Sequence, residues 1–204
     1  MQNNSVFAFN KRLRRKGTRR IHPILAILLG FVAVTLLPAI VVAEERTCRG
    51  ELGSMTVDNL LVPDGASCTL NRTQVKGTIK VESRASLNTR GVHVVGNVQA
   101  ENARQVSVSQ SSRIGGSVQV KQGGSASVLN STVQGDIQYD ANRSSLRVND
   151  NRVGGNVQVI GNQGRAEIYR NRIDGNLQCK ENRPRPVGGN NRVQGNKEDQ
   201  CSAF

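Results

Sequence analysis

The four cysteines are the residues of this 204-residue chain with the most definite chemistry. Thiolates bind zinc where Cys and His residues are closely clustered. Here the shortest gap between two cysteines is 20 residues, and His93 is the only histidine in the same part of the chain. An even number of widely spaced cysteines instead favours disulfides and an oxidising compartment. The sequence therefore predicts no metal site and two disulfides, formed by Cys48, Cys68, Cys179 and Cys201.

The remaining polar residues do not form a catalytic pattern. Nucleophilic catalysis by Ser or Cys needs a histidine base, and a solvated side chain is the simpler interpretation of His93. Polysaccharide-cleaving enzymes use clustered carboxylates, but Glu82, Glu101 and Asp140 share a repeated position that Lys121 interrupts. We therefore predict no catalytic residue and no cofactor. The alternative is a carbohydrate-binding or polysaccharide-cleaving protein that acts on an acidic glycan.

The first 43 residues have the layout of an export signal. They contain seven basic residues and no acidic one, and an apolar run follows from Ile24 to Val42. Short side chains lead up to Ala43 and an acidic residue follows, so we predict signal cleavage between Ala43 and Glu44. The alternative is an uncleaved membrane anchor, because about 20 apolar residues suffice to cross a bilayer. Both interpretations place residues 44–204 in the periplasm, the cell envelope or the exterior.

The net charge of the predicted exported part is moderate. The whole chain has 28 Lys and Arg against 15 Asp and Glu, a formal charge of +13. Seven of the basic residues precede Glu44, which leaves 21 against 15, or +6, for residues 44–204. A charge of this size is ordinary for a soluble domain and permits binding to anionic polymers. It does not require nucleic acid as a partner, and we predict none.

One glycine recurs in the same sequence context along the chain. Aliphatic residues alternate with polar ones around it, as at Val153, Val157 and Val159 around Gly155. A period of two indicates β-strands. The gaps between these glycines are 19 or 20 residues, and the glycines are Gly77, Gly96, Gly116, Gly135, Gly155, Gly175 and Gly195.

The repeat predicts a stacked architecture. A unit of this size cannot bury its apolar side alone, so the units must stack as rungs that bond to the rungs above and below. A second alternating patch lies halfway along each unit, as at Leu146 and Val148, so each rung contains at least two strands. We predict an all-β, right-handed parallel β-helix of about seven rungs for residues 44–204. The clearest aliphatic columns run from Val75 to Val193 and from Ile79 to Leu177.

Polar residues form columns on this predicted solenoid as well. Glutamines predict a side-chain ladder on one face, and asparagines four residues before the glycines predict support of a turn. Bridges from Cys48 to Cys68 and from Cys179 to Cys201 would tie adjacent rungs at the two ends, where open edges invite pairing. We expect a monomer or weak self-association. Arginines three residues before the glycines predict an exposed face that fits an anionic polymer, formed by Arg113, Arg152, Arg172 and Arg192.

The chain resembles the right-handed parallel β-helix class and, within it, a set of small exported bacterial proteins of unassigned function. The residues that carry the resemblance are Thr56 to Leu60, the repeated Gly-Asn-Val-Gln segments, Asn176 to Asn182, and Gly195 to Cys201. This resemblance implies the fold and export, but no reaction. The bactofilins are more distantly similar, although export and paired cysteines depart from their pattern. We therefore expect a non-catalytic exported structural or interaction protein with a rigid repetitive surface and an anionic polysaccharide or envelope component as partner.

Overall fold

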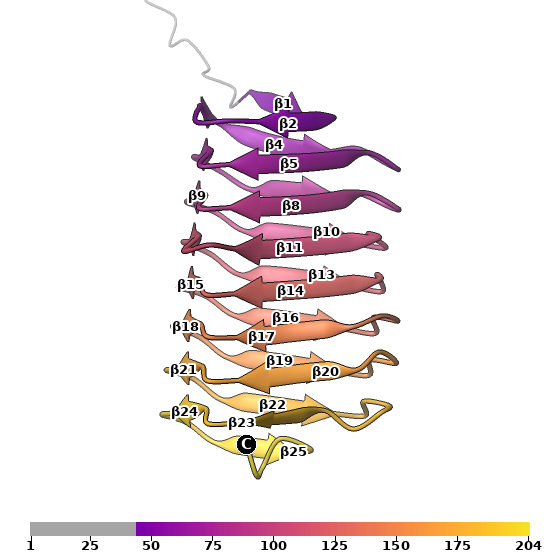
Figure 1. Ribbon diagram of the computed structural model, residues 1–204, viewed down its shortest axis with the longest axis vertical. Helices are drawn as coiled ribbons and strands as arrows, with labels where there is room; N and C mark the ends of the chain where they lie inside the picture. The colour runs from indigo at the N-terminus through magenta and orange to yellow at the C-terminus, as the bar shows by residue number, and fades with distance from the viewer. Residues whose placement is uncertain (1–43) are drawn as a thin grey trace, which may run out of the picture. The chain divides into compact units, whose positions relative to one another are not determined.

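The computed structural model describes residues 44–204, which form a solenoid of three parallel β-sheets without a helix. The chain passes through sheets A, B and C in turn, and each circuit is one rung (Figure 1). Seen from the N-terminal end of the solenoid, the chain winds clockwise as it recedes, which makes the solenoid right-handed (Figure 1). The predicted signal segment, residues 1–43, lies outside the described residues, so the cleavage site at Ala43 stays a prediction.

The strands are short and regularly spaced. Sheet A contains β1 (Glu45–Thr47), β4 (Asn59–Val62), β7 (Ile79–Val81), β10 (Val98–Glu101), β13 (Val118–Lys121), β16 (Ile137–Asp140), β19 (Val157–Ile160), β22 (Leu177–Lys180) and β25 (Lys197–Asp199). Sheet B contains β2 (Gly50–Leu52), β5 (Ser67–Asn71), β8 (Ser86–Arg90), β11 (Gln105–Ser109), β14 (Ser125–Leu129), β17 (Leu146–Asn149), β20 (Ala166–Tyr169) and β23 (Val187–Gly189). Sheet C contains β3 (Thr56–Val57), β6 (Gln74–Val75), β9 (His93–Val94), β12 (Arg113–Ile114), β15 (Thr132–Val133), β18 (Arg152–Val153), β21 (Arg172–Ile173) and β24 (Arg192–Val193).

The solenoid has eight rungs and one further strand, β25, because sheets B and C have eight strands and sheet A has nine. The sequence estimate of about seven rungs counted the anchor glycines, and the first rung has none: Asp58 and Asn59 follow β3 directly. Each rung contains three strands, where at least two were predicted. The additional strand has two residues and lies just before the anchor glycine, as Arg152–Val153 does. The strands of this kind from successive rungs pair with one another and form sheet C.

The aliphatic columns predicted from the repeat form the core. Val118 pairs with Ile137, and Ile137 pairs with Val157, in adjacent strands of sheet A. All three side chains have an exposed fraction of 0%. The column that begins at Val75 in sheet C is also buried, except at Val193 in the last rung, which is half-buried. Full burial of such a side chain stabilises the fold by roughly 1.5–3 kcal/mol, so these columns are the main source of stability.

Thr89 and Tyr139 are buried strand residues that carry a hydroxyl group, and each forms a hydrogen bond. Thr89 pairs with Val108 in sheet B, is fully buried, and donates its hydroxyl to the carbonyl oxygen of Ser107 at 3.2 Å. Tyr139 is buried in sheet A, and its hydroxyl donates to the carbonyl oxygen of Arg147 at 3.3 Å. Burial raises the pKa of the Tyr139 hydroxyl, because the charged phenolate would lose its hydration. The tyrosine therefore stays neutral in the core.

A ladder of buried asparagines supports the corner between sheets B and C, as predicted for Asn151, Asn171 and Asn191. The Nδ2 atom of Asn151 donates to Oδ1 of Asn171 at 3.1 Å, and Nδ2 of Asn171 donates to Oδ1 of Asn191 at 2.9 Å. Each of these Oδ1 atoms also accepts a backbone N–H of the preceding rung at 3.0 Å. Each Nδ2 also donates to a carbonyl oxygen of sheet B, so the buried amides are satisfied.

A second asparagine ladder, which the sequence reasoning did not identify, supports the corner between sheets A and B. Asn142 donates to Asn162 at 3.0 Å, and Asn162 donates to Asn182 at 2.9 Å. Gln200 from the C-terminal tail completes this ladder, because its Oε1 accepts Nδ2 of Asn182 at 3.0 Å. The sequence signal was the same 20-residue spacing that revealed the first ladder.

The anchor glycines leave room for a third polar ladder. A Cβ atom on Gly155 would lie 2.2 Å from Oδ1 of Asp136 in the preceding rung, which no side chain tolerates. That oxygen accepts the backbone N–H of Asn156 at 2.6 Å, and Oδ1 of Asn156 accepts the backbone N–H of Asn176 at 2.9 Å. Close approach of neighbouring rungs therefore explains why glycine precedes the polar residue in each repeat.

The four cysteines pair as the spacing predicted. Cys48 and Cys68 form a disulfide with their Cα atoms 5.7 Å apart, and Cys179 and Cys201 form one with their Cα atoms 5.2 Å apart. The first joins the first rung to β5 of the second. The second joins β22 to the C-terminal tail, whose Phe204 packs against the core. Both ends of the solenoid are therefore tied to the rung next to them.

Replacing Asn171 with Asp tests the first asparagine ladder. Aspartate keeps the shape but loses both N–H donors, so its oxygens would face the carbonyl of Val148 and Oδ1 of Asn191, which are both acceptors. An unsatisfied buried polar group costs about 1–3 kcal/mol, so we expect Asn171→Asp to lower the free energy of unfolding by at least about 2 kcal/mol. Guanidinium denaturation followed by circular dichroism measures it, with Asn88→Asp on the outer face of sheet B as control. Equal stability of the two variants would contradict the ladder.

Candidate anion-binding face

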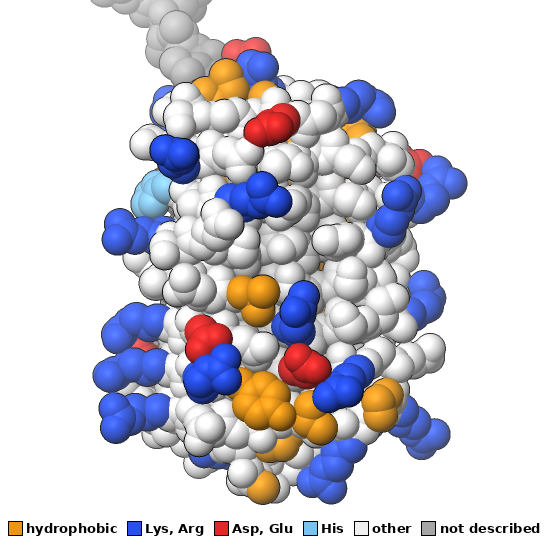
Figure 2. Space-filling model, viewed as in Figure 1, with side chains coloured by type: hydrophobic (Ala, Val, Ile, Leu, Met, Phe, Trp, Pro, Cys, Tyr) orange, Lys and Arg blue, Asp and Glu red, His pale blue; other side chains and the backbone are white. Residues whose placement is uncertain are grey.

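The four arginines predicted to form a basic face all lie in sheet C. Each begins a two-residue strand, points outward, and is followed by a Val or Ile that points into the core. Arg152 pairs with Arg172, and Arg172 pairs with Arg192, in consecutive rungs. Arg113 is separated from these three by Thr132. The structure therefore places three arginines in direct succession and the fourth two rungs away from Arg152. Figure 2 shows basic side chains along the left edge of the molecule, where Figure 1 places sheet C.

One carboxylate lies among these arginines. Asp174 accepts a hydrogen bond from Nη2 of Arg152 at 3.4 Å and lies 3.7 Å from Nε of Arg172. The amide of Gln194 also donates to Asp174 at 3.0 Å. The side chains of Arg152 and Arg172 remain about half exposed, at 56% and 47%. One carboxylate for three stacked guanidinium groups leaves the face with a net positive charge.

The backbone holds these arginines at a fixed spacing. The backbone N–H of Arg172 donates to the carbonyl of Asn151, and that of Arg192 donates to the carbonyl of Asn171, both at 2.8 Å. The asparagine ladder therefore lies directly beside the arginines and fixes the corner from which they project. Adjacent parallel strands are about 4.8 Å apart, so the guanidinium groups extend from a rigid row at that interval.

A second column of arginines, which the sequence reasoning missed, lies at the corner between sheets A and B. Backbone hydrogen bonds continue the stacking from rung to rung at this corner. The N–H groups of Gly124, Arg143 and Arg183 donate to the carbonyl oxygens of Ala103, Gly123 and Asn162, respectively. Arg104 and Arg143 border a surface hollow of about 600 Å³ that Gly123 and Gly124 also line. The signal was present in the sequence, because Arg104, Arg143 and Arg183 each follow an anchor glycine by eight residues.

The outer glutamines of sheet A bond mainly to one another. Gln99 donates to Gln119 at 3.2 Å, Gln119 to Gln138 at 2.9 Å, and Gln138 to Gln158 at 3.1 Å. This ladder was predicted from the repeat. Because the amides already satisfy each other along the sheet, the glutamine face offers a partner fewer free hydrogen-bonding groups than the arginine face does.

Two of the three carboxylates that share a repeated position, Glu82 and Glu101, line a shallow groove of about 530 Å³ beside sheet A, together with Lys80 and Lys121. Glu101 pairs in register with Lys121, and Lys121 with Asp140, so acidic and basic residues alternate there as the sequence indicated. Glu82 lies 3.4 Å from Nζ of Lys80. Charge compensation thus accounts for this column.

His93 lies on the outer side of sheet C, between Gln74 and Arg113. The small hollow beside it is lined by Arg113, Thr132 and Gln134 and by aliphatic residues, with no carboxylate among the lining residues. A catalytic histidine needs a nucleophile that it can deprotonate and a group that orients its ring. The surroundings of His93 provide no carboxylate for the second role.

Within residues 44–204, no three side chains of His, Cys, Asp or Glu lie close enough together to share a metal ion. The part of the chain that the structure describes also has no helix of the length and apolarity needed to cross a bilayer. The sequence matches no protein-family model, and comparison with curated proteins and with solved structures gave no match.

Ion pairs link neighbouring rungs at two corners. Arg170 donates to both carboxylate oxygens of Asp150 at 2.6 and 2.8 Å, and both residues have a positive φ at the corner between sheets B and C. Arg84 donates to Asp64 in the same way. Hydrogen bonds from the guanidinium groups lower the pKa of Asp150 and of Asp64 below the ordinary value for an aspartate. These carboxyl groups therefore remain ionised at neutral pH.

The Arg170 pair gives a prediction for titration. A carboxyl group with a lowered pKa in the folded state stabilises the fold above its unfolded pKa and loses that contribution as the pH falls through the folded pKa. We expect Arg170→Gln to raise the pKa of Asp150 towards its ordinary value of about 3.9. Carbon-detected NMR titration measures it, and the pKa of Asp58, which Lys76 lowers, should not change. An unchanged titration of Asp150 in the variant would rule out Arg170 as the cause.

Proposed function

We propose that this protein is an exported, non-catalytic binding protein that presents a rigid row of arginines to an anionic polymer of the cell envelope. The observation that carries the proposal is the register of Arg152, Arg172 and Arg192 in consecutive strands of sheet C, with Asp174 as the one carboxylate bonded among them. An acidic polysaccharide is the partner that suits this face best.

The spacing of the arginines favours a repetitive partner. Like charges directly opposite each other on neighbouring strands repel modestly, and an anionic chain laid along the solenoid relieves this repulsion at each rung. The row is fixed before binding by strand pairing and by the asparagine ladder. A preorganised site loses less conformational freedom on binding. The column of Arg104, Arg143 and Arg183 adds a second, more widely spaced basic line.

The location outside the cytoplasm rests on two features. Both pairs of cysteines lie at disulfide distance, and disulfides persist mainly in oxidising compartments. The basic and apolar residues before Glu44 have the composition of an export signal. With cleavage after Ala43 the protein is periplasmic or extracellular, and without cleavage it is anchored to the membrane with the solenoid outside.

Removing the arginine row tests this function. We expect Arg152→Ser/Arg172→Ser/Arg192→Ser to elute from immobilised polygalacturonate at about half the NaCl concentration needed for the unchanged protein, because exposed ion pairs are screened by salt. The matched control is Arg72→Ser/Arg90→Ser/Arg147→Ser, which removes three exposed arginines that form no ion pair within the described residues. The control should elute close to the unchanged protein.

Three results would count against this function. Equal retention of the arginine-row variant and the unchanged protein would exclude the sheet C face as the binding site. An equal loss in both triple variants would mean that net charge alone causes retention. Release of unsaturated or reducing sugar ends from the polymer would favour the alternative of a polysaccharide-cleaving enzyme.

A further inference from the structure

The strands at the two ends of this solenoid have edges that match those of a second copy of the same chain. Within the described residues, β1 is the outermost strand of sheet A at one end and β25 is the outermost strand at the other. Each pairs with one neighbouring strand there. The carbonyl of Asp199 in β25 accepts the backbone N–H of Ser202 at 3.3 Å, and the other outer backbone groups of these two strands have no backbone partner within residues 44–204 and can pair with another strand. Because all strands are parallel and the rungs repeat, a second copy stacked end to end would continue the ladder of sheet A, the sheet with the additional strand β25.

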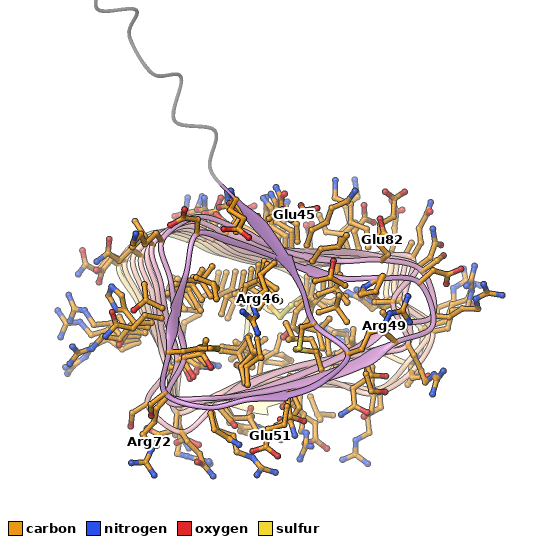
Figure 3. The ribbon with its side chains drawn as sticks, turned by 90° about the horizontal axis from the view of Figure 1, so that it is seen from above. Glu45, Arg46, Arg49, Glu51, Arg72 and Glu82 are labelled. Carbon is orange, nitrogen blue, oxygen red and sulfur yellow. A yellow bond between two sulfur atoms is a disulfide. The ribbon has the colours of Figure 1, made fainter. Side chains whose placement is uncertain are left out.

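The residues at the two ends of one core column interrupt this continuity. In sheet A, Arg46 pairs with Leu60 and Lys197 pairs with Leu177. Both therefore occupy the same inward-facing column, whose members between them are aliphatic and have an exposed fraction of 0%. These members are Leu60, Ile79, Val98, Val118, Ile137, Val157 and Leu177. Figure 3 shows Arg46 over the opening of the core at the N-terminal end of the solenoid.

End-to-end stacking would bring these two cations together. If β25 of one copy paired with β1 of the next in the register of sheet A, Lys197 would lie directly opposite Arg46, about 4.8 Å away along the stack. The same contact would place Asp199 opposite Cys48, because these two residues share the neighbouring inward column. Two cations and one carboxylate would then lose their hydration between the stacked copies, so one positive charge would remain unpaired, and burial of an unpaired charge is strongly unfavourable.

We propose that Arg46 and Lys197 prevent the solenoid from polymerising end to end. The disulfides do not serve this purpose alone: they tie Cys48 and Cys201 to neighbouring strands, but within residues 44–204 the outer edges of β1 and β25 are not paired with another strand. This inference concerns the ends of the solenoid and does not depend on the arginine face or on its ligand.

The test compares full-length variants in mild detergent by sedimentation velocity and negative-stain electron microscopy. Arg46→Leu/Lys197→Leu extends the aliphatic column to both ends. We expect it to form linear polymers and to lower the concentration at which half of the protein is assembled by at least about tenfold, which corresponds to about 1.4 kcal/mol. Arg46→Glu/Lys197→Glu keeps two like charges at the same positions and should remain monomeric. The matched control, Arg90→Leu/Lys180→Leu, makes the same changes of residue type on outward-facing positions and should also remain monomeric.

Circular dichroism and the absence of free thiols would establish that each variant is folded. The single variants Arg46→Leu and Lys197→Leu, which change one residue each, provide a second measurement of assembly. The proposal is overturned if the folded Arg46→Leu/Lys197→Leu variant sediments as the unchanged protein does. It is also overturned if the outward-facing control polymerises to the same extent, or if the unchanged protein itself forms end-to-end polymers.

Discussion

Every rung of this solenoid is held by backbone hydrogen bonds to the rungs above and below it, so residues one repeat apart must lie on top of each other. This constraint determines which side chains the interior accepts. A column tolerates Val, Ile and Leu because they fill the same space at each level, as they do at Val118, Ile137 and Val157. A polar residue is accepted inside only where its hydrogen bonds are complete, as at Thr89 and in the asparagine ladders.

The same constraint makes the surface repetitive. A residue type that recurs at one position of the repeat becomes a straight line of identical groups on the outside, about 4.8 Å apart. Glutamines in such a line bond to one another, whereas arginines repel and leave positive charge available to a partner. The arginine face and the charged ends thus depend on the same constraint, because strand register determines where each side chain lies. The chemistry of the side chains then determines whether a column forms hydrogen bonds within itself, binds a partner or repels a second copy of the chain.

Much of the fold could be predicted because the repeat is visible in the sequence. The alternation around Gly155 and the spacing of 19 or 20 residues were sufficient for the aliphatic columns, the glutamine ladder, the Asn151 ladder and the cysteine pairing. The first rung was missed because Asp58 and Asn59 stand where later rungs have glycine. The pairing of Thr89 with Val108 was missed because Thr89 is polar and interrupts the aliphatic alternation that marks the inward positions of the other rungs. The position of Arg46 over the core is known only from the pairing of β1 with β4. The three residues of β1 are too few to show the alternation by which a strand could be aligned with the repeat.

Stacking itself is tested most directly by a distance measured along the solenoid. Gln99 and Gln178 lie on the same outer column, four rungs apart, so nitroxide labels on Gln99→Cys and Gln178→Cys should be about 19 Å apart at 4.8 Å per rung. Pulsed electron–electron double resonance should give one narrow distribution centred near that distance. A broad distribution, or a mean distance far beyond it, would contradict the claim that equivalent residues stack in register.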